Sequence, residues 1–219
     1  MTSETELSII IPTLNEAELL PTTLESIFQQ KASGFEVIVV DAGSEDATTA
    51  IAVARGAQVI HTRIAQRAHQ MNLGAAQARG RSLIFLHADS CLPSTGLAAI
   101  KRALRDHTTI GGAFIRRFNH PSVFLRITCM LADLRGYVLG WHLGDQGIFI
   151  RRLQFQQLGG FPDWGIFEDL ELSRRMSRHG VVVTLRPAIR TSGRRFGNHP
   201  IKQTFRDVVL TIQHFLDRN

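Results

Sequence analysis

This chain has few of the residues and runs that mark several protein classes. Its 219 residues include two cysteines, Cys91 and Cys129, with no CxxC pair. So little cysteine argues against a disulfide framework or a structural zinc site, and is typical of buried thiols in a reduced, cytoplasmic protein. No stretch reaches about 18 consecutive apolar residues, so we expect no membrane-spanning helix. The polar, acidic first six residues do not resemble a secretory signal.

Several familiar motifs are also missing. No predicted strand is followed by GxGxxG, and there is no GxxxxGK[ST] loop or HExxH pair. These absences argue against a dinucleotide oxidoreductase, a P-loop enzyme and a zinc protease. Aromatic residues make up 7% of the chain and its arginines are scattered. With no recognisable nucleic-acid-binding motif either, we expect no nucleic-acid partner.

Positive charge is concentrated in the second half of the chain. The net charge is +6, but residues 1–100 carry six basic and ten acidic side chains, and residues 101–219 carry 19 and nine. Of the 25 basic residues, 22 are arginines, which suit bidentate contacts with phosphate or carboxylate. A second half with net charge +10 could attract a diphosphate, an anionic acceptor, a membrane surface or nucleic acid. The alternative is a solvated basic surface.

Strands and helices alternate along the first half. Continuous apolar runs predict buried strands at 7–11, 35–40, 58–60 and 82–87, with helices between them. Asn15 and Ser44 are candidate caps of the first two helices. This alternation predicts a parallel sheet with right-handed crossovers.

The second half of the chain is less regular. Strands are predicted at 111–118, 146–151 and 181–185, and helices at 93–105, 121–138, 168–179 and 201–215. Helix 121–138 is amphipathic, and apolar side chains share one of its faces. Those residues are Val123, Phe124, Ile127, Met130, Leu131, Leu134 and Val138. We find no repeat or linker, so we expect one α/β domain over 1–219, with halves at about 1–110 and 111–219.

Carboxylates stand at the ends of two predicted strands. Asp41 and Asp89 each follow a buried apolar run, and ligands of open α/β sheets sit beyond the carboxyl ends of strands. A lone carboxylate together with ligand phosphates and water is a usual way to hold Mg²⁺ or Mn²⁺, so Asp89 is a candidate metal ligand. A third pair, Glu168 and Asp169, begins a predicted helix. Helix capping is the alternative role for each of these groups.

Four segments carry a resemblance to a known family. Residues 7–16 followed by 37–46 resemble the nucleotide-binding opening of family 2 glycosyltransferases, which have the GT-A fold: a mostly parallel central sheet flanked by helices, with a mixed second half. His87-Ala88-Asp89 falls where that family carries its DxD metal motif. Residues 159–162 followed by Glu168-Asp169 resemble its GGF and ED segments. The resemblance covers residues 7 to about 196.

The chain also resembles a smaller subgroup, the arsenosugar-biosynthesis type found beside radical-SAM enzymes. Residues 67–75, 144–149 and 191–196 carry this second similarity. Genes of this subgroup also occur away from any arsenic pathway, so the acceptor does not follow from it.

The resemblance implies a donor site, a metal site and a catalytic base. The residues implied to line the donor site are Pro12, Thr13, Asn15, Glu16, Asp41, Arg67, His87, Ala88, Arg194 and Arg195. Asp89 would ligate Mg²⁺ or Mn²⁺, and Asp169, beside Glu168, would act as general base. Asp145 and Gln146 would orient the acceptor. His87 departs from the family pattern, which has an aspartate there that contacts the donor, so it could bond a ribose hydroxyl, ligate a softer ion or be a satisfied imidazole.

These residues lead to one main hypothesis and two alternatives. The main one is a metal-assisted, inverting glycosyltransferase that moves a sugar from a nucleotide-diphospho-sugar to a small-molecule or lipid-linked acceptor. Peripheral contact with the inner membrane face is compatible with it. The first alternative is a basic non-catalytic module that binds an anionic membrane or nucleic acid. The second is a sugar-phosphate nucleotidyltransferase, but residues 12–16 lack the glycine and basic residues that its loop requires. The sugar, nucleotide, acceptor and oligomeric state do not follow from the sequence.

Overall fold

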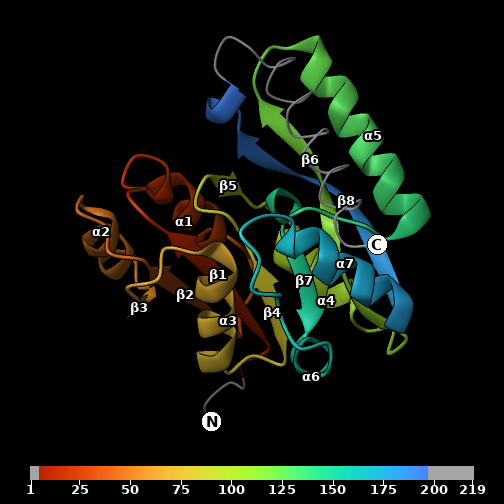
Figure 1. Ribbon diagram of the computed structural model, residues 1–219, viewed down its shortest axis with the longest axis horizontal. Helices are drawn as coiled ribbons and strands as arrows, with labels where there is room; N and C mark the ends of the chain where they lie inside the picture. Colours follow the sequence, from red (N-terminus) through yellow and green to blue (C-terminus); the bar gives the residue numbers. More distant parts are fainter. Residues whose placement is uncertain (1–4, 197–219) are drawn as a thin grey trace.

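All eight strands of the molecule's described part belong to one sheet. The computed structural model describes residues 5–196, apart from the side chain of Arg195, so the helix predicted for 201–215 lies outside the described residues. The strands lie in the order β3-β2-β1-β4-β7-β6-β8-β5, with helices packed on both faces (Figure 1). This arrangement confirms the predicted α/β class with a mixed second half.

The first half forms the parallel part of the sheet. Its strands are β1 (Leu7–Thr13), β2 (Phe35–Asp41), β3 (Gln58–His61) and β4 (Ser82–Phe85), and its helices are α1 (Leu20–Phe28), α2 (Thr48–Ala54) and α3 (Arg67–Gln77). In β1, Ile9 and Ile11 enter one hydrophobic core while Ile10 enters the other, on the opposite face. Because this strand is covered on both faces, its sequence is continuously apolar, and the predicted strand is confirmed.

The rest of the chain adds antiparallel pairing. The first half ends with β5 (Ser90–Cys91) and α4 (Gly96–Ala103). The elements that follow are β6 (Thr109–Asn119), α5 (Val123–Leu139), η1 (Gly144–Gln146), β7 (Ile148–Arg151), α6 (Arg152–Gln157), α7 (Glu168–His179), β8 (Val181–Ser192) and η2 (Arg194–Phe196). β7 is antiparallel to both β4 and β6, and β8 runs parallel to β6.

Strand β8 continues well beyond the predicted segment 181–185. In the sequence, Pro187 predicts the end of a strand, because proline has no backbone N–H to donate to a neighbouring strand. The register between β6 and β8 shifts between Phe114 and Arg116, which lie opposite Leu185 and Ile189. The extra residues, Pro187 among them, therefore sit in an irregular bulge, and pairing resumes as far as Ser192.

The predicted caps of the first two helices are wrong. α1 begins at Leu20 and α2 at Thr48, and neither Asn15 nor Ser44 caps a helix. Instead, the loop after β1 bonds to the loop after β2. The Asn15 N–H donates to Ser44 Oγ at 2.8 Å, and Asn15 Oδ1 accepts from the Glu45 N–H at 2.8 Å. These partners are about 30 residues away, beyond the reach of local capping rules.

Helix α5 confirms the predicted helix but turns its apolar face outward. It buries Leu125, Cys129, Ala132 and Gly136 against the sheet. Its larger apolar side chains are exposed, at 65% for Met130 and 69% for Val138. An amphipathic helix usually turns its apolar stripe to the core, so this exposed face calls for an explanation. Within residues 5–196, no helix is both long and apolar enough to cross a bilayer.

Candidate active site

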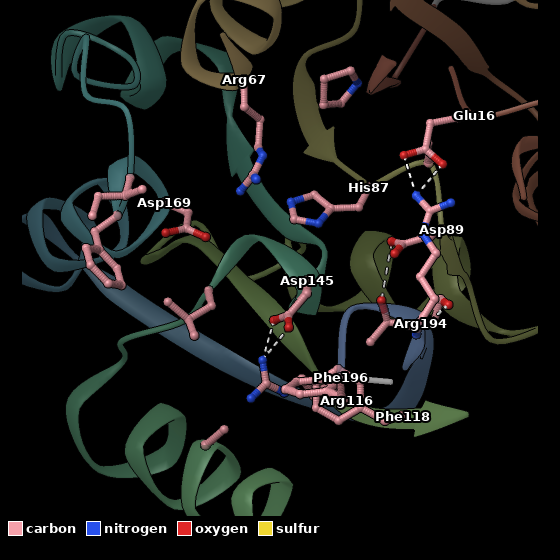
Figure 2. Close-up of a pocket in the computed structure, with 18 of the residues that line it drawn as sticks. Glu16, Arg67, His87, Asp89, Arg116, Phe118, Asp145, Asp169, Arg194 and Phe196 are labelled. Atoms are coloured by element: carbon pink, nitrogen blue, oxygen red, sulfur yellow. Dashed lines mark hydrogen bonds and ion pairs between the residues drawn. The ribbon is translucent and has the colours of Figure 1, made fainter. Parts of the chain in front are cut away.

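A cavity of about 750 Å³ opens beyond the carboxyl ends of β1 and β4. Loops from both halves of the chain line it, as do α5 and η2. Figure 2 shows Arg67, His87, Asp89, Asp145 and Asp169 arranged around this space. The position agrees with the rule that ligands of α/β sheets bind beyond the strand ends.

The cavity contains many of the predicted site residues. Those that line it are Pro12, Thr13, Glu16, Arg67, His87, Ala88, Asp89, Asp145, Asp169 and Arg194. Asn15, Asp41, Gln146 and Glu168 are not part of its lining. The side chain of Arg195 lies outside the described part of the chain. The structure thus brings together residues that are up to about 180 positions apart in sequence.

Asp41 organises the wall of the cavity from behind. Its buried carboxylate accepts hydrogen bonds from Thr13 Oγ1 at 3.0 Å, from the Gly43 N–H at 3.0 Å and from Ser44 Oγ. Burial alone would raise the pKa of Asp41, but these hydrogen bonds outweigh it and hold the pKa below its ordinary value. Asp41 is therefore an ionised anchor for the loops that follow β1 and β2.

An ion pair crosses the mouth of the cavity. Arg194 in η2 donates to both carboxylate oxygens of Glu16, each at 2.6 Å (Figure 2). Both residues were predicted to contact the donor, and here they contact each other. This contact joins the last described segment to the loop after β1.

His87 and Asp89 lie two residues apart in the turn that follows β4 but differ in environment. The pKa of His87 is lowered by burial and by the charge of Arg67, despite three nearby carboxylates that act in the opposite direction. Its Nε2 is buried and has no hydrogen-bond partner within residues 5–196. In the same part of the chain, the Asp89 carboxylate receives two long contacts, from Ser90 Oγ at 3.4 Å and Thr191 Oγ1 at 3.5 Å. Asp89 therefore keeps acceptor capacity directed at the cavity.

The cavity offers a partial set of metal ligands. No three His, Cys, Asp or Glu side chains of residues 5–196 gather closely enough to hold an ion by themselves. The acceptor capacity of Asp89 fits a cation whose other ligands come from phosphate oxygens and water, whereas His87 Nε2 is directed toward Gly144 and Asp169.

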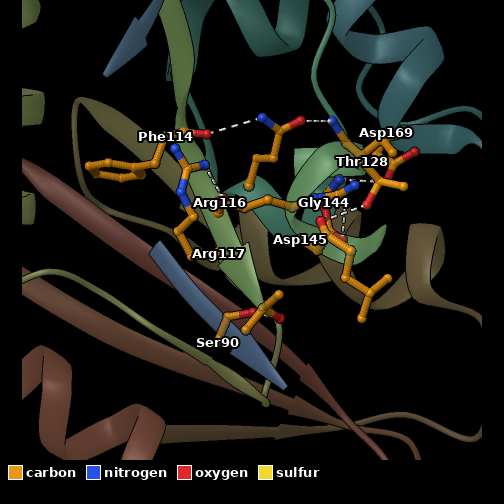
Figure 3. Close-up of polar contacts among 12 residues, drawn as sticks. Ser90, Phe114, Arg116, Arg117, Thr128, Gly144, Asp145 and Asp169 are labelled. Atoms are coloured by element: carbon orange, nitrogen blue, oxygen red, sulfur yellow. Dashed lines mark hydrogen bonds and ion pairs between the residues drawn. The ribbon is translucent and has the colours of Figure 1, made fainter. Parts of the chain in front are cut away.

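Asp169 and Glu168 begin α7 but occupy different surroundings. Asp169 lines the cavity, and its Oδ2 accepts from the Gly144 N–H at 2.5 Å (Figure 3). Glu168 does not line the cavity; its side chain is 2% exposed and lies 3.5 Å from Arg67 Nη1. Burial and the charge of Asp169 raise the pKa of Glu168 to about 7, although Arg67 opposes this shift. Phe167, which precedes the pair, has a left-handed backbone with φ of 63°.

The predicted acceptor residues have separate structural tasks. Asp145 forms a buried ion pair with Arg116, which also lies over the Phe118 ring at 4.8 Å (Figures 2 and 3). Gln146 is wholly buried. Its amide nitrogen donates to the Phe114 carbonyl at 3.1 Å, and its Oε1 accepts from the Leu143 N–H at 3.0 Å. Gln146 thus holds the η1 loop in place and cannot touch an acceptor in this arrangement.

Sequence reasoning missed several residues of the cavity. Arg116, Phe118, Arg135 and Phe196 all line it. Arg135 donates to the Trp141 carbonyl at 3.1 Å and to Gln146 Oε1 at 3.3 Å, with no carboxylate partner among the described residues. Phe196 ends the segment 191–196 that carries the subgroup similarity, but no motif marks the other three side chains. The only signal was the excess of arginine in the second half.

Comparison with known proteins matches this chain to a family. The family model described as glycosyl transferase family 2 matches residues 8–160. The chain belongs to glycosyltransferase family 2. The predicted family and enzyme class are therefore confirmed, and the non-catalytic module is excluded as a description of the chain. The match covers the parallel part of the sheet, β6, α5 and β7.

Named relatives of this glycosyltransferase agree with the family. It is 39% identical to a PGL/p-HBAD biosynthesis glycosyltransferase of Mycobacterium bovis, over 81% of this chain and 72% of the relative. A dolichyl-phosphate beta-glucosyltransferase of Drosophila melanogaster is 37% identical, over 38% of this chain and 31% of that protein. The arsenosugar subgroup stays a prediction.

Solved structures confirm the GT-A fold of the glycosyltransferase. A mannosyltransferase from Pyrobaculum calidifontis, in complex with GDP-Man and Mn²⁺, superposes with a TM-score of 0.71 at 23% identity over 84% of this chain. S. aureus TarS in complex with UDP-GlcNAc gives 0.69 at 17% identity over 85% of the chain. This chain spans 56% and 58% of those two structures. At such identities the likeness shows the fold alone.

Proposed function

We propose that this glycosyltransferase moves a sugar from a nucleotide-diphospho-sugar to an acceptor hydroxyl, with inversion and with help from Mg²⁺ or Mn²⁺. One observation carries the proposal: Asp89 and Asp169 reach one cavity from different halves of the chain, beside Arg67 and Arg194. The named ligands of the two structural neighbours are nucleotide sugars, which supports this class of donor.

The donor would lie across the ends of β1 and β4. Pro12, Thr13 and Glu16 would border the nucleoside, behind which Asp41 anchors the loops. Asp89 would hold the divalent ion, while His87 lines the same cavity on the side of Gly144 and Asp169. When bound, this ion neutralises the charge that develops on the diphosphate leaving group. Arg67, and Arg194 if it leaves Glu16, would add positive charge at the same place.

Asp169 would be the general base. It would accept the proton of the acceptor hydroxyl as the new bond to the anomeric carbon forms and the bond to the diphosphate breaks. Inversion requires one such base and no covalent intermediate. Glu168 is less suited to this task, because it is buried and does not line the cavity. The Gly144 N–H holds Asp169 in place.

The acceptor would enter between α5 and η1. This side of the cavity combines apolar Leu131 and Phe118 with the charged groups of Arg135 and the Arg116–Asp145 pair. Such a lining suits an amphipathic acceptor, either a small molecule or the head of a lipid-linked one.

Donor binding is tested first, by thermal shift with nucleoside diphosphates and their sugar conjugates, with and without Mn²⁺. A ligand at about 100 times its dissociation constant stabilises the folded protein by about 2.7 kcal/mol. Asp89→Asn should remove the part of the shift that requires Mn²⁺. Asp163→Asn, on an exposed loop outside the cavity, is the matched control and should retain it. A cation-dependent shift that survives in Asp89→Asn contradicts the metal assignment.

The base is tested with Asp169→Asn. The amide oxygen can still accept from the Gly144 N–H, so the fold and donor binding should persist while the proton acceptor is lost. Transfer, or the slower hydrolysis of the donor by water, should fall about 10²- to 10⁴-fold. Release of the nucleoside diphosphate measures either reaction. Near-normal turnover with an unchanged donor shift rules out Asp169 as the base.

A further inference from the structure

Helix α5 carries a continuous stripe of exposed, large apolar side chains, called here the α5 stripe. Its members are Val123, Ile127, Met130, Leu131, Leu134, Tyr137 and Val138, and each is about half or more exposed. Their spacing of three or four residues keeps them on one side of the helix. At 1.5 Å per residue, the stripe runs for about 22 Å. Figure 1 shows α5 at the margin of the molecule, beside β6 and β8.

Helix α5 differs from an ordinary surface helix because its large apolar side chains face outward and its smaller residues face the sheet. The side chains that it buries are those of Leu125, Cys129, Ala132 and Gly136, which are mostly small. At Gly136, a Cβ would lie 2.8 Å from His142 Nε2, so the close approach to the sheet depends on glycine. The sheet therefore accepts only the small side of α5. Contiguous apolar patches of this kind on soluble proteins commonly mark interaction sites.

Charge around the α5 stripe favours an anionic partner surface. Between residues 114 and 145 the chain has four arginines and two acidic residues, and Arg116 is buried in an ion pair with Asp145, so the local net charge is +2. Asp133 is engaged by Arg117 Nη1 at 2.8 Å. On a helix with 100° per residue, Arg126 and Arg135 fall on opposite edges of the stripe; Arg126 is exposed, whereas the guanidinium of Arg135 turns to the cavity and the Trp141 carbonyl. Arginines beside an apolar stripe match the pattern of helices that lie in the plane of a lipid headgroup layer.

A second copy of the chain fits this surface less well. Pairing two α5 stripes across a two-fold axis would bring arginines near arginines, with the one acidic side chain of α5 already engaged. We therefore propose that α5 docks the enzyme onto an anionic lipid surface through the α5 stripe. Leu131 belongs both to the stripe and to the cavity lining, as Arg135 lines the cavity from the stripe's edge. Given the proposed function, docking would turn the acceptor side of the cavity toward the lipid surface, where a lipid-linked acceptor would be presented.

The test uses the full-length chain and two matched double variants. Leu134→Glu with Val138→Glu places two carboxylates on the α5 stripe. Leu153→Glu with Val53→Glu makes the same chemical change at apolar residues of similar exposure on α6 and α2. Both pairs change the net charge equally, so a nonspecific electrostatic effect should be the same in both. Glutamate is a good helix former, and the four sites are exposed, so folding should persist in each.

Co-sedimentation with vesicles is the readout. Wild type and the α6/α2 variant should bind vesicles of phosphatidylcholine with phosphatidylglycerol, and binding should weaken with salt and on pure phosphatidylcholine. The affinity of the stripe variant for these vesicles should be lower by a factor of about ten or more. Equal losses in the two variants overturn the proposal. The proposal is also overturned if the wild type is a monomer that does not bind vesicles. In that case another part of the same chain would cover the stripe.

Sedimentation velocity tests whether a second copy of the chain, instead of a lipid surface, covers the α5 stripe. If the wild type is a dimer that does not bind vesicles, and the stripe variant is a monomer, the stripe is the contact surface of a second copy. That result overturns the proposal. Failure of the proposed function is seen independently, as the absence of a nucleotide-dependent thermal shift. Both double variants should keep that shift, because none of the four substituted residues lines the cavity.

Discussion

Glu168 shows how one buried side chain can set a pH dependence. Its carboxyl is removed from water beside the carboxyl of Asp169, and Arg67 at 3.5 Å offsets only part of that cost. Glu168 Oε1 has no hydrogen-bond partner. The pKa in the folded protein is therefore about 7, above the ordinary value of 4.5.

This shift predicts that folding stability is lost as the pH rises. Below pH 4.5 the carboxyl is protonated in both states, whereas between 4.5 and 7 the folded state keeps a proton that the unfolded state has released. The free energy of unfolding should therefore fall by up to about 3 kcal/mol over this window and then level off. Glu168→Gln should remove this component, as measured by urea unfolding at pH 5 and pH 8. Exposed Glu45→Gln is the control, and equal pH slopes in wild type and Glu168→Gln would refute the assignment.

At the scale of the element, β6 depends on two consecutive glycines. Gly111 and Gly112 lie where β6 passes between β7 and β8. A Cβ on Gly111 would overlap the carbonyl oxygen of Phe149, and one on Gly112 would overlap that of Val183. The neighbouring strands β7 and β8 therefore leave no room for a side chain at these two positions of β6.

Gly112→Ala should destabilise the fold through this overlap. The backbone oxygen of Val183 cannot move aside without disturbing the β6–β8 ladder, so we expect a loss of about 1–3 kcal/mol in the free energy of unfolding. Gly165→Ala is the matched control: it has open space around its Cβ position and should change stability by less than about 0.5 kcal/mol. Urea unfolding followed by circular dichroism compares the two. Equal stability of the two variants would show that β6 can shift to accept the methyl group.

At the scale of the whole molecule, the two halves share their cores. β4 of the first half pairs with β7 of the second, so the sheet is continuous between them. One core cluster includes Ile9 with Phe149, and the other includes Ile10 with Ile150. We expect the halves to be one folding unit, as the prediction of a single domain over 1–219 requires.

Unfolding should accordingly occur in one cooperative step. Both tryptophans, Trp141 and Trp164, lie in the second half, so their fluorescence reports on that half, whereas far-UV circular dichroism reports on the whole chain. The two signals should give coincident urea transitions. A fluorescence transition at clearly lower urea would mean that the second half unfolds by itself and would contradict the single unit.

Most of the order of strands and helices, though not β5 or α6, could be predicted from the sequence alone, as could the positions of Asp89 and Asp169 after a strand and at a helix start, and the family. The physical reason is local. Side-chain periodicity reports burial along a segment, and a carboxylate after an apolar run marks a strand end. Helix 168–179 and strand 35–40 match α7 and β2 within one residue.

Only the tertiary structure decided which of these side chains meet, and in which direction each face points. Gln146 has the chemistry of an acceptor ligand, yet its amide is used by the backbone of Phe114 and Leu143. Arg116 and Arg135 carry no motif but reach the cavity. Periodicity showed that α5 has an apolar side, but not that the sheet would accept only its small side. Such outcomes depend on contacts between distant segments, and the chemistry of one segment does not specify its partner.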